Sequence, residues 1–250
     1  MKYAQNEIYV DIIEEVDAII DTNGQVVSSE VTGLVKCNSR LSGLPDLTLS
    51  FVDPEVIDDC SFHPCVRYNR YDRDRVVSFV PPDGNFELMS YRVSPMSAIV
   101  PPLYATPQIT YDVDAHTGGV GTGRVSVVVG TKPNTSLQIP PRKGQIQVED
   151  VLITIPFPRS VRTSNLTANA GTVLYDEASK VAKWNIGKLG RDRTVQLSGS
   201  LVMSGQRPES SPPVEVYWKV PMASISGVAV GSLQLSNERY RPYKGVRVMT

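Results

Sequence analysis

The sequence contains few of the residues on which most catalytic and metal sites depend. It has only two histidines and three cysteines in 250 residues. The histidines, His63 and His116, are far apart, and the cysteines lack the close spacing of a metal site. Because neither a Ser-His-Asp set nor a cluster of metal ligands is suggested, we expect no enzyme activity, no metal and no cofactor.

An excess of charge of one sign is also missing. The chain has 25 Lys and Arg residues against 26 Asp and Glu residues, which gives a net charge of −1. A chain without a basic excess is not expected to bind nucleic acid. No apolar run is long enough to span a bilayer, and the first residues do not lead into the apolar segment of a signal peptide. With an odd number of cysteines, these absences favour a reducing compartment.

What the sequence does have is a series of short strand-like runs separated by turn residues, with 18 glycines and 19 prolines. This pattern is typical of an all-β sandwich. Asp21-Thr22-Asn23-Gly24 predicts a tight turn between a strand over 8–20 and a return strand over 25–37. The first of these runs would also tolerate a helix, because its second half does not alternate cleanly.

Other turn and charge patterns lead to further expectations. Pro81-Pro82-Asp83-Gly84 predicts a second β-hairpin, between strands over 75–80 and 86–93. The prolines that follow Val93 suggest a linker or an edge strand; they are Pro95, Pro101, Pro102 and Pro107. Four arginines interrupted by aspartates suggest a mixed surface strand and, more weakly, a patch for acidic lipids; they are Arg67, Arg70, Arg73 and Arg75.

Three segments carry a resemblance to a known family. They are Leu41 to Leu47, Asp58 to Arg67, and Phe79 to Val93. These segments resemble the C-terminal signal-binding domain, or mu homology domain, of the medium (mu) subunits of clathrin-type adaptor complexes. Leu41 to Phe51 and Ser61 to Cys65 are most similar to the medium subunit of adaptor protein complex three.

The resemblance implies a fold and a domain organisation. The family has an elongated, all-β, immunoglobulin-like sandwich structure of two subdomains, one inserted in the other. Residues 1–93 and 222–250 would together build subdomain A. Residues 94–221 would form the inserted subdomain B, and the change in composition near Val93 fits that boundary.

The resemblance also implies a function in membrane traffic. The chain would recognise Tyr-x-x-Φ sorting signals, where Φ is a bulky apolar residue, in the cytosolic tails of transmembrane cargo. Its other partners would be the remaining subunits of a heterotetrameric adaptor complex, with an indirect association with membranes and a weaker expectation of contact with acidic lipids. The expected location is cytoplasmic and peripheral, on endosome, trans-Golgi and coated-vesicle membranes, and the expected work is sorting towards lysosomes.

Matched to the family's motif, a pocket for the tyrosine of the signal would use residues from both ends of the chain. Asp11 would accept a hydrogen bond from the tyrosine hydroxyl, and Tyr9 would pack against the ring. Arg247 would stack its guanidinium on the ring. Asn38 stands where the family often has lysine, and Gly245 where some members have tryptophan. Both departures reduce the contacts with the ring.

A second pocket, for the Φ residue, would be lined by apolar side chains, with Lys244 and Gly245 at the rim beside the peptide backbone. The apolar residues that match this pocket are Ile8, Val10, Val230, Leu233 and Val246. The signal would lie extended along an exposed strand, so that backbone hydrogen bonds give affinity and alternate side chains give specificity.

Simpler interpretations of the same residues remain. Asp11 could be a solvent-facing strand residue, Lys244 and Arg247 ordinary surface charges, and the apolar set plain core. A mu-like endocytic domain could have lost the tyrosine site and bind another partner. A secreted carbohydrate-binding sandwich would fit the β pattern and the sequons at Asn134 and Asn165, but the odd cysteine count and the missing signal peptide argue against it.

Overall fold

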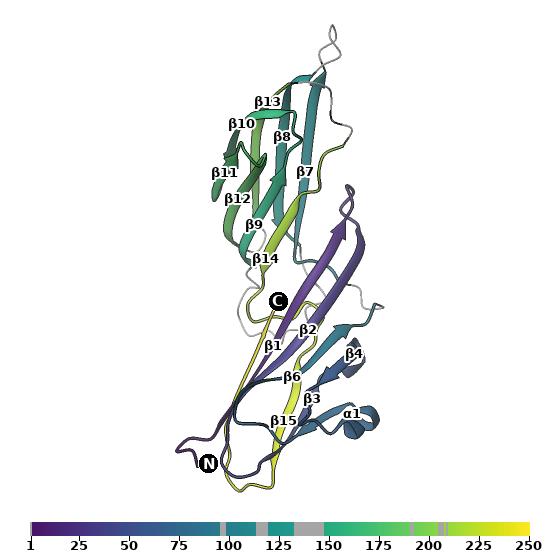
Figure 1. The fold of residues 1–250 in the computed structure, drawn as a ribbon, viewed down its shortest axis with the longest axis vertical. Helices are drawn as coiled ribbons and strands as arrows, with labels where there is room; N and C mark the ends of the chain where they lie inside the picture. The colour runs from purple at the N-terminus through teal and green to yellow at the C-terminus, as the bar shows by residue number, and fades with distance from the viewer. Residues whose placement is uncertain are drawn as a thin grey trace.

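The computed structural model describes residues 2–95, 99–113, 120–132, 148–190, 193–204, 208 and 210–250. The described chain is almost entirely β-structure, with one short α-helix, and it forms an elongated molecule of two stacked sandwiches (Figure 1). The all-β fold expected from the sequence is confirmed. The two loops that carry His116 and Asn134 lie outside the described residues.

The first sandwich consists of a five-stranded and a three-stranded sheet. The strands of the five-stranded sheet are, in spatial order, β16 (Tyr243–Met249), β1 (Glu7–Ile20), β2 (Val26–Arg40), β6 (Gly84–Val93) and β4 (Ile57–Phe62). Those of the three-stranded sheet are β15 (Val230–Ser236), β3 (Asp46–Phe51) and β5 (Val76–Phe79). A short 3-10 helix, η1 (Pro54–Val56), and the helix α1 (Tyr68–Asp74) connect strands of this sandwich.

The second sandwich consists of two four-stranded sheets. One has the spatial order β10 (Val161–Ala168), β13 (Thr194–Met203), β8 (Val120–Thr131) and β7 (Leu103–Val113). The other has the order β11 (Thr172–Asp176), β12 (Val181–Leu189), β9 (Val148–Pro156) and β14 (Glu215–Lys219). Pro107 lies in β7, which is an edge strand, as its residue type requires.

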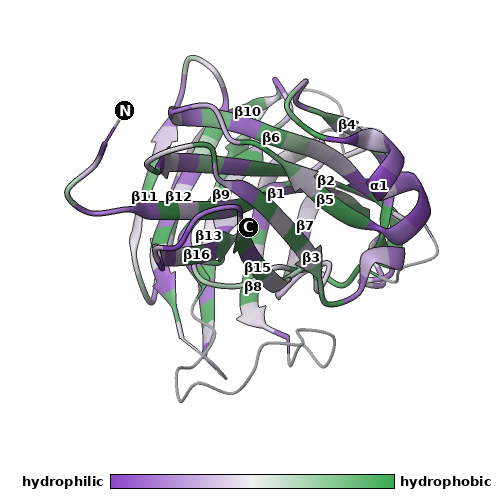
Figure 2. Ribbon diagram, turned by 90° about the horizontal axis from the view of Figure 1, so that it is seen from below, coloured by the Kyte–Doolittle hydropathy of each residue, from purple (hydrophilic) through white to green (hydrophobic). Residues whose placement is uncertain are grey.

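Each sandwich has its own hydrophobic core. The buried residues of the first core come from the chain up to Ile99 and from Ile225 onward. Those of the second core all lie between Leu103 and Ala223. Figure 2, viewed along the long axis, shows apolar and polar segments alternating along the strands. The division into 1–93, 94–221 and 222–250 stays a prediction, and we propose it because the two cores separate close to these boundaries.

The strand β1 follows the alternation expected from the sequence. Ile8, Val10 and Ile12 have no exposed surface, whereas Tyr9 between them is exposed. The turn after β1 holds the predicted geometry: Gly24 has a φ of 82° and donates to the Asp21 carbonyl at 3.0 Å. Residues 7–20 therefore form a strand and not a helix, because one face of the run packs into the core.

Two local predictions were wrong. The turn at Pro81 to Gly84 does not close a hairpin: β5 pairs with β3 in one sheet, and β6 pairs with β2 and β4 in the other. The arginine-rich stretch is not a surface strand but contains α1, whose Tyr71 is buried. In both segments the structure is determined by contacts with residues distant in the sequence, and the local sequence pattern does not reveal these contacts.

A buried carboxylate fixes the segment that returns from the second sandwich to the first. Glu14 on β1 is only 2% exposed. It accepts hydrogen bonds from the Tyr91 hydroxyl at 3.0 Å, from the backbone amides of Ile225 at 3.0 Å and Ser226 at 3.2 Å, and from the hydroxyls of Ser224 and Ser226. Burial is the main cause that raises the pKa of Tyr91, so this phenol stays a donor to the carboxylate.

Candidate functional site

The two ends of the chain meet in the parallel pair of β1 and β16. Tyr9 lies opposite Gly245, and Asp11 lies opposite Arg247. Because paired residues point to the same face of a sheet, these four residues share the outer face of the five-stranded sheet, away from the core. Asn38 on β2 lies opposite Tyr9 on the other side and is half-buried. We call Tyr9, Asp11, Asn38 and Arg247 the tyrosine site.

Asp11 and Arg247 form a two-point ion pair at the surface. Arg247 Nε donates to Asp11 Oδ1 at 2.9 Å, and Nη2 donates to Oδ2 at 2.6 Å. The hydrogen bond with Asp11 raises the pKa of the Arg247 guanidinium. The Arg247 side chain is 60% exposed and that of Asp11 only 22%, so solvent screens the pair but the carboxylate is held in one orientation.

The ring of Tyr9 lies over Gly245. A Cβ atom added to Gly245 would be 2.5 Å from Tyr9 Cδ1, so only glycine leaves this space to the ring. The Tyr9 hydroxyl donates to Glu7 at 3.0 Å, and this hydrogen bond is the main cause that raises the pKa of Tyr9. Tyr243 flanks the same ring, with the two centroids 5.8 Å apart. An aromatic surface thus borders the Asp11–Arg247 pair.

The predicted Φ residues lie on the inner face of the same strand pair and on β15. Ile8 and Val10 are fully buried, so in this structure neither is exposed to a ligand. Leu233 is 8% exposed, Val230 is half-buried and Val246 is 42% exposed. A ligand would therefore reach these residues from the open edge of the sandwich, where Val246 is exposed. Ile8 and Val10 lie beneath the surface and pack against the core.

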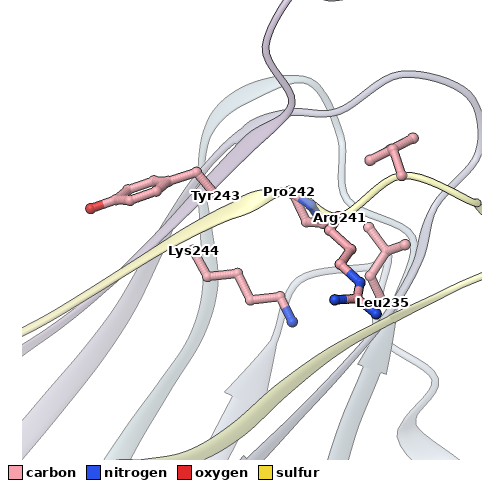
Figure 3. A pocket seen from close by; sticks show the side chains of 6 residues that line it. Leu235, Arg241, Pro242, Tyr243 and Lys244 are labelled. Carbon is pink, nitrogen blue, oxygen red and sulfur yellow. The ribbon is translucent and has the colours of Figure 1, made fainter.

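Lys244 crosses the opening between the two sheets of the first sandwich. It lies on the same face as Val246, and its Nζ donates to the carbonyl of Leu233 on β15. Next to it is a pocket of about 420 Å³ lined by Leu235, Tyr240, Arg241, Pro242, Tyr243 and Lys244 (Figure 3). We call it the Arg241 pocket. Except for Lys244, its residues were not predicted from the sequence; the run of aromatic, basic and proline residues from Tyr240 was the available signal.

The other sequence-level candidates are placed in ordinary structural roles. His63 Nδ1 accepts from the Cys65 amide at 3.1 Å, and its ring packs against Phe86. Within the described ranges, no group of His, Cys, Asp or Glu side chains is arranged to hold a metal ion. In the same part of the chain, no helix combines the length and hydropathy needed to cross a bilayer.

Known proteins resemble this chain over its whole length. AP-3 complex subunit mu of Dictyostelium discoideum is 47% identical over 252 residues, which cover 100% of this chain and 57% of that protein. AP-3 complex subunit mu-1 of Gallus gallus is 39% identical with the same coverage. The chain thus spans little more than half the length of these relatives.

A solved structure and a family description agree with the relatives. The yeast delta-COP-I mu-homology domain matches with a TM-score of 0.66 and 17% identity, over 99% of this chain and 96% of that one, which shows a shared fold. The description "Adaptor complexes medium subunit family" matches residues 1–250. These findings confirm the resemblance that was drawn from three short segments. The chain belongs to the adaptor complexes medium subunit family.

Proposed function

We propose that this domain recognises Tyr-x-x-Φ signals in the cytosolic tails of transmembrane cargo, as part of a vesicle adaptor. One observation carries the proposal: on the β1–β16 strand pair, Asp11 and Arg247 lie on the outer face and Val246 lies on the inner face. In an extended peptide, residues three apart point to opposite sides. A Tyr-x-x-Φ peptide along the edge of β16 could therefore send its tyrosine to the outer face and its Φ side chain to the inner face.

The position of β16 supports this mode of binding. In the described part of the chain, the sheet has no strand beyond β16, so this edge can accept an added strand. The exposed Val246 and the half-buried Val230 offer apolar surface at the same edge. The peptide would gain backbone hydrogen bonds along β16 and bury apolar area at Val246.

At the tyrosine site, the Asp11 carboxylate would accept a hydrogen bond from the tyrosine hydroxyl. The guanidinium of Arg247, already fixed by Asp11, would lie against the ring as a cation–π partner. Because the ion pair orients both groups before the peptide arrives, little side-chain entropy is lost on binding. A phosphotyrosine would place negative oxygens against Asp11, so we expect phosphorylation of the signal to abolish binding.

The family supports the wider context of the proposal. Other subunits of an adaptor complex would be the stable partners, and the AP-3 relatives favour sorting between endosomes, the trans-Golgi network and lysosomes. The domain would then work at the cytosolic surface of these membranes without crossing them. Its work would be recognition and not catalysis.

The proposal is tested by calorimetric titration of the folded chain with a Tyr-x-x-Φ peptide. We expect micromolar binding that is lost when the peptide tyrosine is replaced by alanine or phosphotyrosine. Asp11→Asn should weaken binding by about 10- to 100-fold, the effect of one charge-assisted hydrogen bond. Asp17→Asn, an exposed aspartate farther along β1, is the matched control and should bind normally. Equal affinity of the Asp11 variant, or of the phosphopeptide, would contradict the proposed role of Asp11.

A further inference from the structure

The Arg241 pocket has a rigid frame. The Tyr240 hydroxyl donates to the Ser42 carbonyl at 2.6 Å, and the Tyr243 amide donates to the Asn6 carbonyl at 2.9 Å. Lys244 is tied to Leu233 across the opening. Hydrogen bonds from three different segments thus hold the walls in place, so the pocket exists before a ligand arrives.

Two cations of the pocket, Arg241 and Lys244, have no acidic partner among the described residues. Figure 3 shows the Arg241 and Lys244 side chains reaching toward the same space, whereas the Tyr243 ring points away. No ion pair joins either cation to a carboxylate within the ranges that the structure describes. Glu238, in the same turn, instead accepts from the Leu44 amide at 2.9 Å. Lys244 uses one of its three donors, so both cations can still bind an anion.

The structure also favours one direction for a peptide on β16. Beyond Arg247 the edge is closed, because Met249 forms a bridge with Pro221 and Thr250 exchanges backbone hydrogen bonds with Val220. Toward Lys244 the edge opens into the Arg241 pocket. A signal with its tyrosine at Arg247 would therefore place Φ near Lys244, and the residues that follow Φ would reach the pocket.

We propose that the Arg241 pocket binds a carboxylate two residues after Φ, and this inference rests on the proposed function. In an extended chain the side chain at Φ+2 points to the same face as Φ, and that at Φ+1 points to the other. Each residue advances the chain by about 3.3 Å, so a peptide with Φ beside Lys244 places Φ+2 level with Pro242, which also lines the pocket. The carboxylate comes from an acidic side chain or from the end of a cargo tail.

The test compares amidated peptides of identical composition, which contain Tyr-x-x-Φ followed by Ser-Asp or by Asp-Ser. We expect the Ser-Asp peptide, with its acid at Φ+2, to bind about two- to fivefold more tightly, as for one exposed ion pair. Arg241→Gln should remove this difference. Arg239→Gln, an exposed arginine of the same turn that does not line the pocket, should keep it. A third peptide that ends at Φ+2 with a free carboxylate, beside its amide, tests the chain terminus as the source.

The outcomes separate this inference from the function on which it rests. A preference for the acid at Φ+2 that disappears in Arg241→Gln supports it, and the terminal-carboxylate pair shows which source is favoured. Equal affinities of the two isomers, while binding still depends on Asp11, would overturn the inference alone. A preference that persists in Arg241→Gln would overturn it as well. No binding of any Tyr-x-x-Φ peptide to the folded chain would overturn the proposed function and the inference together.

Discussion

The two sandwiches use similar strands but differ in how their edges form. In the second sandwich every recorded strand pair is antiparallel. In the first, β1 and β16 form a parallel pair, and this edge carries the candidate site. Antiparallel neighbours can be joined by a tight turn, but parallel strands need a long crossover. Here the crossover contains the whole second sandwich, so the site depends on a pairing that no local turn enforces.

The sandwiches also contain different natural probes. All three cysteines, Cys37, Cys60 and Cys65, belong to the first sandwich and are free thiols. Both tryptophans, Trp184 and Trp218, lie in the β11-β12-β9-β14 sheet of the second. Thiol labelling therefore reports the opening of the first sandwich and Trp184 fluorescence reports the second, whereas Trp218 packs against both cores and responds to either. The two sandwiches can therefore be followed separately without introducing new residues.

The largest expected effect is in the second sandwich. Trp184 is fully buried, and its Nε1 donates to the Ala170 carbonyl at 2.8 Å. Trp184→Ala should lower the free energy of unfolding by about 3–5 kcal/mol, through lost burial and a cavity. Urea denaturation followed by Trp218 fluorescence measures this, with Lys183→Ala as the exposed neighbouring control. If Cys37 becomes labelled at the same lower urea concentration, the sandwiches unfold as one unit and the comparison fails.

A smaller effect is expected at the connection between the sandwiches. The hydroxyl of Tyr91 and the backbone amide of Ser226 both donate hydrogen bonds to the Glu14 carboxylate. In Glu14→Gln, the side-chain NH2 group is itself a donor, so it would face other donors. We expect a loss of about 1–3 kcal/mol in the free energy of unfolding. Faster hydrogen exchange at the amides of Ile225 and Ser226 should accompany it. Glu15→Gln, on the exposed face, should change neither quantity, and an unchanged Glu14 variant would contradict the anchoring role.

The first sandwich should also respond to alkaline pH through one thiol. Burial raises the pKa of Cys37 to about 12. In the unfolded chain the thiol loses its proton near the ordinary pKa of cysteine, whereas in the folded chain it keeps the proton. The free energy of unfolding is therefore highest below that ordinary pKa and decreases as the pH rises toward 12. Relative to Cys37→Ala, the free energy of unfolding of the native protein should fall by about 1–2 kcal/mol by pH 10. Parallel pH curves for the two proteins would contradict this.

The smallest effect on stability is expected at the site itself. Gly245→Ala should displace the Tyr9 ring, which is exposed and can move, so the loss should stay below about 1 kcal/mol. Peptide affinity should nevertheless fall, because the ring no longer borders the Asp11–Arg247 pair. Gly190→Ala is the matched control, since nothing lies within 4 Å of its added Cβ. Unchanged affinity would show that the position of Tyr9 does not shape the site.

The sequence predicts best where structure is decided locally. The Asn-Gly turn after β1 depends on neighbouring residues and can be seen in the chain. The crossover from β5 to β6 could not be predicted, because a Pro-Pro-Asp-Gly turn is compatible with a hairpin and with a change of sheet. Helix α1 was missed because a seven-residue segment held by one buried tyrosine has no clear period.

The candidate site shows the same limit. Asp11 stands out in an apolar run, but nothing in the periodicity pairs it with Arg247, and only the family resemblance joined them before the structure did. The burial of Ile8 and Val10 follows the alternation along β1, but the Arg241 pocket follows from how two sheets approach each other at one edge. Such an approach depends on packing across the sandwich and leaves no local mark in the chain.

The parallel pairing of β1 and β16 has a consequence for synthesis of the protein. Asp11 and Arg247 are separated by 236 positions, so a ribosome adds Arg247 long after Asp11. Domains commonly begin to fold as they emerge, from the N-terminus onward. The second sandwich can thus be complete while β1 still lacks its partner. A chain that ends before β16 would carry a folded second sandwich but an incomplete tyrosine site, so the proposed binding requires β16 to have been synthesised.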